Sequence, residues 1–198
     1  MAGDYVVGYA TIMDQANARK LGLASQPELV TVTGMQRWFG FPDLAGRTLE
    51  DVFDTEGVLQ EQYRDLASTT IAASPSHSFN AVVFGNVSRD VLDRLDCAEA
   101  ESYLDRISIP PEYIKRFRDE SPWGPRENAP VWAYAARSHI TVPRRGSVRL
   151  VRQDVTYNNA YLRRCMAAAK VHGGDFLSRY MVTTYLADRQ TPIAAVVR

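Results

Sequence analysis

The strand-like and helix-like patterns of this chain intermingle without alternating regularly. A doubly wound parallel sheet needs a helix after nearly every strand, and this chain does not provide one. Runs rich in β-branched and aromatic residues predict strands at 4–10, 28–41, 79–87, 102–110 and 131–137. The order of elements therefore favours an α+β fold, in which a small mixed β-barrel or curved sheet is flanked by helices.

Capping residues mark the helices predicted in the first half of the chain. Asp14 begins a short helix that Gly22 ends, because aspartate caps helix N-termini and glycine tolerates the left-handed conformation after the last turn. Ser88 begins a second helix, over 89–96, directly after a buried strand.

Two glycines predict interruptions. Gly34 predicts a bulge or bend within the strand over 28–41. Gly57 interrupts the segment 48–66, whose apolar spacing otherwise favours a helix. We therefore expect a bent strand followed by a broken helix.

Two further helices are predicted near the C-terminus. An asparagine, either Asn158 or Asn159, begins the first, and a Gly-Gly pair closes it. Asp175 is expected to cap the second, over 176–188. Joined by so short a turn, the two helices are expected to pack as a hairpin across the sheet.

The balanced composition limits the function classes. Of the 198 residues 45% are hydrophobic, enough for one domain over 1–198 with a substantial core. Lysine plus arginine and aspartate plus glutamate each number 23, and the formal net charge of +0 argues against nucleic acid or a membrane surface as partner. With no signal peptide, no membrane-spanning apolar run and two cysteines in unlike surroundings, we expect a cytoplasmic protein.

No motif for a metal, nucleotide or other cofactor is found. The chain lacks GxGxxG, GxxxxGK[ST] and HExxH, and the spacing of its three histidines is not that of metal ligands. His172 is interpreted as a surface residue at a helix C-terminus. Cys165 shares a helix face with Met166 and Ala169 and is interpreted as core filler. We expect no metal and no cofactor.

Two segments stand out by composition. DESPWGPRENAP, at 119–130, is rich in proline, glycine and charge, which predicts a mobile loop. PRRGSVRLVR, at 143–152, is the densest basic stretch. Because its residues alternate around a turn, it is interpreted as a solvated edge hairpin.

The stretch VVGYATIMD, at 6–14, joins the first predicted strand to the first predicted helix. Such a turn leaves unpaired backbone N–H groups at the mouth of a helix, where they can hold an anion. An ordinary strand-to-helix turn explains the same residues, so the turn alone does not decide between the two interpretations.

Five acids lie within 92–105, where a helix is expected to end and a strand to begin. Most charge runs of this kind are solvated faces, and that interpretation stays open here. Glu99, however, is flanked by Ala98 and Ala100, small neighbours that allow its side chain to point inward. A carboxylate in a dry pocket has a raised pKa and becomes a useful general acid or base.

Together these stretches resemble the γ-glutamylcyclotransferase-like family. YATI, at 9–12, is similar to the family's first turn, and TVTGMQRWFG, at 31–40, to its second strand. The segment 80–109 resembles the central strand, the pattern xVSxxxLxxLDxxE and the aromatic-containing strand that follows. The segment 155–186 is similar to the C-terminal helices. The resemblance covers most of the chain in the family's order, and LDxxE with its upstream strand is the most specific part.

The resemblance implies a small mixed barrel that releases an amine from a γ-glutamyl amide with formation of 5-oxoproline. The α-amino group of the substrate attacks its own γ-carbonyl, so no metal, cofactor or enzyme nucleophile is implied. By the same resemblance, Glu99 is the general base and acid. Backbone N–H groups for the glutamyl carboxylate or the developing oxyanion are implied at Tyr9, Ala10, Thr11 and Ile12.

Two tyrosines and two alanines complete the comparison with the family. Tyr103 and Tyr161 match positions near the pocket, as walls or hydroxyl contacts, although packed core aromatics explain them equally well. The family has glycine where this chain has Ala10 and Ala100, which implies a somewhat reshaped pocket. If Ala10 had to adopt a positive φ, alanine would cost roughly 1 kcal/mol there.

The implied partner is a small γ-glutamyl amide or amine. Glutathione is one candidate, and the altered turn favours another γ-glutamyl-amine metabolite. The loop over 119–130 is the candidate lid that selects the amine. The alternative function is a non-catalytic relative that binds an amino-acid-like ligand or acts as an interaction module. The sequence does not determine the oligomeric state.

Overall fold

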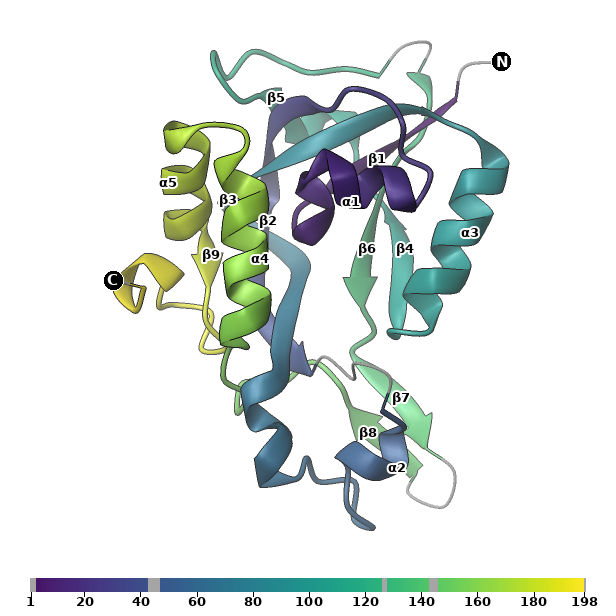
Figure 1. The fold of residues 1–198 in the computed structure, drawn as a ribbon, viewed down its shortest axis with the longest axis vertical. Coiled ribbons are helices and arrows are strands. Elements are labelled where there is room, and N and C mark those ends of the chain that lie inside the picture. The colour runs from purple at the N-terminus through teal and green to yellow at the C-terminus, as the bar shows by residue number, and fades with distance from the viewer. Residues whose placement is uncertain (1–2, 43–46, 126–127, 143–145, 198) are drawn as a thin grey trace.

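A computed structural model of the protein describes residues 3–42, 47–125, 128–142 and 146–197, and it combines one large sheet with flanking helices (Figure 1). The strands are β1 (Asp4–Gly8), β2 (Glu28–Pro42), β3 (Ala67–Val87), β4 (Leu104–Ser108), β5 (Ile114–Arg116), β6 (Val131–Ala136), β7 (His139–Val142), β8 (Gly146–Arg149) and β9 (Thr184–Tyr185). The α-helices are α1 (Gln15–Lys20), α2 (Leu49–Val52), α3 (Arg89–Ala100), α4 (Asn159–Lys170) and α5 (Gly174–Thr183). Short 3₁₀ helices are η1 (Thr11–Met13), η2 (Glu61–Leu66), η3 (Pro111–Tyr113) and η5 (Ile193–Ala195).

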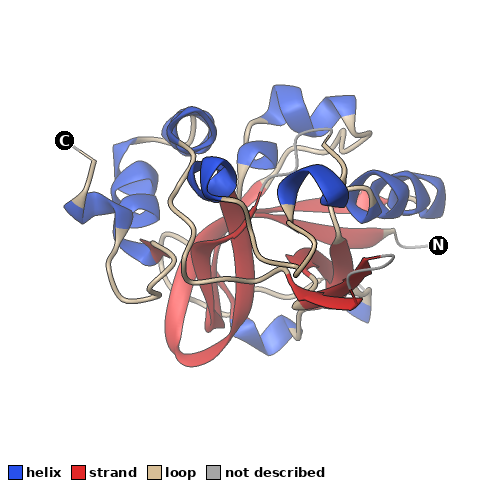
Figure 2. Cartoon of the chain, turned by 90° about the horizontal axis from the view of Figure 1, so that it is seen from below, coloured by secondary structure: helices blue, strands red, loops and turns tan. Residues whose placement is uncertain are grey.

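The large sheet has the strand order β4-β6-β1-β3-β2-β5, and β9 also pairs with β2. The β1–β6 and β2–β9 pairs are parallel, whereas the other neighbours are antiparallel. Most of the helices lie on one side of the strongly curved strands (Figure 2). The predicted α+β fold is confirmed, although the path through the described strands runs from β4 to β5 without closing into a complete barrel.

The β2–β3 pair is the longest in the sheet and runs from Glu28 opposite Val83 to Pro42 opposite Ala67. A register shift at Gly34, whose φ is +72°, confirms the predicted bulge. The predicted start of β3 at residue 79 was wrong, because the strand begins twelve residues earlier in the described chain. Serine, proline and histidine interrupt the apolar pattern there, and pairing with β2 overrides that local signal.

Side-chain caps place three helices as expected. The Asp14 carboxylate accepts a 2.8 Å hydrogen bond from the Ala16 N–H, and Gly22 follows α1 with a φ of +89°. Ser88 caps α3, and Asn158 caps α4, which resolves the choice between the two asparagines.

Two helix boundaries differ from those predicted. Helix α3 continues to Ala100, so Glu99 lies in its last turn and not between a helix and a strand. Gly173, and not Asp175, is the N-cap of α5. This helix ends at Thr183 because the next two residues pair with β2 as β9, and sheet pairing takes precedence over local helix propensity.

Two clusters of buried apolar side chains form the core. One includes Val6, Phe84 and Leu92 and lies against the helices, and the other includes Val7 and Phe79. Adjacent residues of β1 belong to different clusters because successive side chains of a strand point to opposite faces. None of the helices in the described ranges is long and apolar enough to cross a membrane.

A small lobe contains α2 and the β7–β8 hairpin, which lie together at the lower end of Figure 1. A hairpin is present, but it pairs 139–142 with 146–149 in a two-stranded sheet of its own, and Val148 and Leu150 are buried, so the prediction of a solvated edge hairpin over 143–152 was wrong in these respects. Residues 143–145 lie outside the described residues. Gly57, with a φ of +76°, separates α2 from η2, as expected for the broken helix. Ile140 and Val148 bury the inner face of the hairpin in the first core cluster.

Candidate active site

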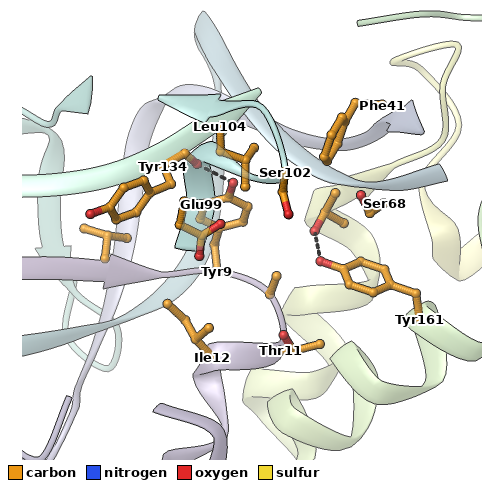
Figure 3. A pocket seen from close by; sticks show the side chains of 13 residues that line it. Tyr9, Thr11, Ile12, Phe41, Ser68, Glu99, Ser102, Leu104, Tyr134 and Tyr161 are labelled. Atoms are coloured by element: carbon orange, nitrogen blue, oxygen red, sulfur yellow. Dashed lines mark hydrogen bonds between the residues drawn. The ribbon is translucent and has the colours of Figure 1, made fainter. Parts of the chain in front are cut away.

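A cavity of about 230 Å³ opens where the end of β1, the start of β3, the last turn of α3 and the start of α4 meet (Figure 3). Among its described lining residues Glu99 is the only acid, and none is Lys, Arg or His. The lining consists of Val7, Tyr9, Ala10, Thr11, Ile12, Phe41, Ser68, Thr69, Glu99, Ser102, Leu104, Tyr134 and Tyr161. The first turn, Glu99 and Tyr161, which are far apart in the sequence, therefore share one cavity.

The Glu99 carboxyl is half-buried and comes from the last turn of α3. Among the described residues it has no ion-pair partner, and burial raises its pKa. In Figure 3 its side chain lies beside Tyr9 and faces Tyr161 across the cavity. A carboxyl with a raised pKa and no protein partner can exchange a proton with a bound molecule.

The turn after β1 presents free backbone donors. Within the described chain, the N–H groups of Thr11 and Ile12 donate to no protein acceptor, as is usual for the first residues of a helix. Ala10 has a φ of −129°, so this position does not need glycine and alanine adds no strain of that kind.

Side chains from two other elements hold this turn. The Asn17 side-chain amide donates to the Thr11 carbonyl at 3.3 Å. The His172 Nε2 lies 2.8 Å from the Met13 carbonyl, and its ring packs against Phe176. The interpretation of His172 as a simple surface residue was therefore wrong, because it connects the end of α4 to η1.

Two tyrosine hydroxyls of the cavity wall have protein partners. Tyr9 donates to the backbone carbonyl of Tyr134, and the Tyr134 hydroxyl donates to Asp96 at 2.8 Å. Asp96 also pairs with Arg106 at 3.2 Å. Burial raises the pKa of both tyrosines, so both stay neutral at physiological pH.

Tyr161 and Tyr103, which the family resemblance implied near the pocket, differ in position. The Tyr161 hydroxyl lies 3.1 Å from Thr69 Oγ1 at the edge of the cavity. Tyr103 is not among the lining residues, although Ser102 and Leu104 on either side of it are. With a φ of +58° it forms the turn between α3 and β4, where its side chain packs against the core.

Several lining residues were not identified from the sequence. Ser68 and Thr69 lie in the first part of β3, which was not predicted as a strand. The β-branched run at 69–71 was the available signal. Tyr134 lies in the correctly predicted strand β6, but strand alternation alone does not indicate which buried side chain borders a cavity.

The loop over 119–130 does not border this cavity, since none of its described residues belongs to the lining. Trp123 is only 4% exposed, packs edge-on against Tyr5 with 5.3 Å between ring centres, and donates to Glu28 at 3.2 Å. The described part of the predicted lid therefore does not border the cavity. Its Trp123 and Ala129 instead pack in the second core cluster. Residues 126–127 of the loop lie outside the described residues.

The cysteines and histidines do not form a metal site in the part of the chain that the structure describes. No three His, Cys, Asp or Glu residues there are grouped closely enough to hold an ion. Cys165 is buried in the core, as interpreted from its helix face, and burial raises the pKa of its thiol to about 11. It is therefore a neutral thiol at pH 7.

Comparison with known proteins identifies the fold. No family profile and no curated protein sequence matches this chain. Similar solved structures include one named Gamma-glutamyl cyclotransferase, with a TM-score of 0.57 and 10% identity over 89% of this chain and 85% of that one. An uncharacterized protein from Homo sapiens has a TM-score of 0.57 and 11% identity over the same shares. YkqA from Bacillus subtilis has a TM-score of 0.51 and 10% identity over 88% of this chain and 51% of its own. The chain therefore has the γ-glutamylcyclotransferase-like fold.

Proposed function

We propose that this protein is an enzyme that releases an amine from a γ-glutamyl amide and forms 5-oxoproline. The observation that carries the proposal is the half-buried Glu99 carboxyl, which borders the same cavity as the free N–H groups of Thr11 and Ile12. The likeness in fold to a structure named Gamma-glutamyl cyclotransferase supports the same reaction class.

In the proposed reaction, the α-amino nitrogen of the substrate forms a bond to its own γ-carbonyl carbon. The bond from that carbon to the leaving nitrogen then breaks, and the departing amine takes up protons as the α-ammonium group loses them. Glu99 carries a proton from the first nitrogen to the second, which suits a carboxyl whose pKa burial has raised. Holding the two ends of the glutamyl group together supplies much of the rate enhancement.

The remaining wall residues bind and orient the substrate in this proposal. The Thr11 and Ile12 N–H groups contact the glutamyl carboxylate or the developing oxyanion. Tyr9 and Tyr161 form opposite walls. The cavity is smaller than the roughly 300–1,000 Å³ of typical drug-sized sites, so it suits the glutamyl group, while the amine extends toward solvent.

A panel of γ-glutamyl amides with different amines tests the proposal. Each is incubated with the protein, and 5-oxoproline and the free amine are measured by mass spectrometry. Formation of both in equal amounts from at least one member is expected. If no member yields 5-oxoproline while an amino-acid-like ligand still binds, the protein is a non-catalytic binder and the proposal is wrong.

A further inference from the structure

Arg37, in β2, is an arginine with no exposed surface. Its Nε donates to Thr184 Oγ1 at 2.7 Å, and Nη1 donates to the carbonyls of Asn80 at 2.7 Å and Tyr9 at 3.2 Å. Nη2 contacts the Asn80 side chain and the Tyr180 carbonyl at 3.2 and 3.3 Å. One side chain of β2 therefore connects the turn after β1 with β3, α5 and β9.

Every partner of this guanidinium is uncharged. Among the described residues no Asp or Glu forms an ion pair with Arg37. The ring of Tyr180, at 3.9 Å, and that of Phe79, at 5.2 Å, supply cation–π contacts in place of a counterion. Burial lowers the pKa of Arg37 to about 10, so the group is still a cation at pH 7.

The cation lies directly behind the cavity wall. It bonds the carbonyl of Tyr9, a lining residue at the start of the turn. The described lining contains no positive side chain of its own. In a poorly screened interior, an uncompensated cation attracts an anion over a longer distance than it does in water.

We infer that Arg37 is a specificity-determining residue of this cavity: its buried charge favours ligands that carry a carboxylate, and its bond to Tyr9 orients the turn that receives them. The inference rests on the proposed function, because it concerns the glutamyl carboxylate that substrate and product share. Arg37 acts through the wall and does not touch the ligand, since it is not among the lining residues.

Binding of two product-like molecules tests this inference. 5-Oxoproline carries the carboxylate, and its primary carboxamide has nearly the same shape without the charge. Calorimetric titration of both into the wild type should give tighter binding of the acid by roughly tenfold. In Arg37→Gln that ratio should fall severalfold, with the Thr11 and Ile12 N–H groups still in place, whereas Arg37→Lys should keep part of it because an ammonium retains the charge but not the fork of donors.

Arg189→Gln is the matched control. Arg189 also binds β2, through Gln36 at 2.8 Å, and stacks on Trp38, but it contacts neither the turn nor the lining. This variant should keep the wild-type ratio. Thermal unfolding shows whether each variant is folded. If Arg37→Gln does not fold, the binding ratios of the wild type and of Arg37→Lys still test the inference.

Each outcome separates the two claims. Equal binding of acid and carboxamide by the wild type, or the wild-type ratio in a folded Arg37→Gln protein, overturns the role of Arg37 and leaves the reaction untouched. If the wild type binds neither molecule and the amide panel gives no 5-oxoproline, the proposed function fails and the inference fails with it.

Discussion

The end of α3 and the loop over 119–130 are both rich in charge, but among the described residues only the end of α3 borders the cavity. Both combine several charges with small residues, and both are candidates for functional segments. In the first, Glu99 turns toward a cavity and is half-buried. In the second, Trp123 is inserted into the core and no described residue reaches the cavity.

The difference shows what makes a charged segment a site. Helix α3 holds Glu99 beside the cavity because Leu92 and Leu95, seven and four residues earlier on the same face, are buried in the core. In the loop it is the aromatic side chain of Trp123 that is buried, while Asp119 and Glu120 stay exposed. Charge composition therefore does not distinguish the two segments. The position of their buried side chains decides which segment borders the cavity.

Glu99→Gln should have the largest effect. It keeps the shape of the side chain but removes the proton carrier, so 5-oxoproline formation should fall about 10²- to 10⁴-fold with folding retained. Glu101→Gln, two residues along and exposed, is the control and should stay within twofold of the wild type. Rates from an amine-release assay check both. Activity of Glu99→Gln close to wild type would remove Glu99 from the mechanism.

Trp123→Ala tests the other side of the comparison. Removing this buried side chain and its contact with Tyr5 should lower the free energy of unfolding by about 3–5 kcal/mol. The kcat/KM of the protein that remains folded should stay within about twofold. Val171→Ala, at an exposed position, should change stability by less than about 0.5 kcal/mol. A selective change in KM would show instead that the loop reaches the substrate.

Tyr161→Phe should have a smaller effect on activity. The change removes the hydroxyl that lies beside Thr69 at the cavity edge and leaves the ring in place. We expect kcat/KM to fall severalfold and stability to fall by about 1 kcal/mol. Tyr157→Phe is the matched control, since both rings meet Phe39 edge-on with 6.2 Å between centres and Tyr157 does not line the cavity. Equal activities of the two variants would exclude a role for the Tyr161 hydroxyl.

The smallest effect concerns the pH dependence of stability. Because burial raises the pKa of Glu99 in the folded state, its ionised form destabilises the fold at pH 7. Glu99→Gln should therefore unfold at a higher temperature than the wild type at pH 7. The difference should shrink as the pH falls through the folded-state pKa and vanish below the ordinary value of 4.5. Thermal scans across this range check it, and a constant difference at every pH would contradict it.

Most of the local structure could be predicted because its causes are local. Asp14, Ser88 and Asn158 cap helices by bonding N–H groups two or three residues away, so neighbouring sequence is sufficient. The turn after β1 and Glu99 were also identified as candidate site residues. The start of β3 and the end of α5 were not, since each depends on pairing with β2 from a distant part of the chain.

The mixed order of strands and helices, the caps that begin the helices and the glycine that bends β2 all follow from local sequence. That Glu99 borders a cavity, that Trp123 does not, and that Arg37 is an uncompensated cation behind the wall depend on the folded chain as a whole. The two groups of features differ in the range of the interactions that cause them. Capping and strand propensity act between near neighbours, whereas burial and charge compensation depend on which distant segments the folded chain brings together.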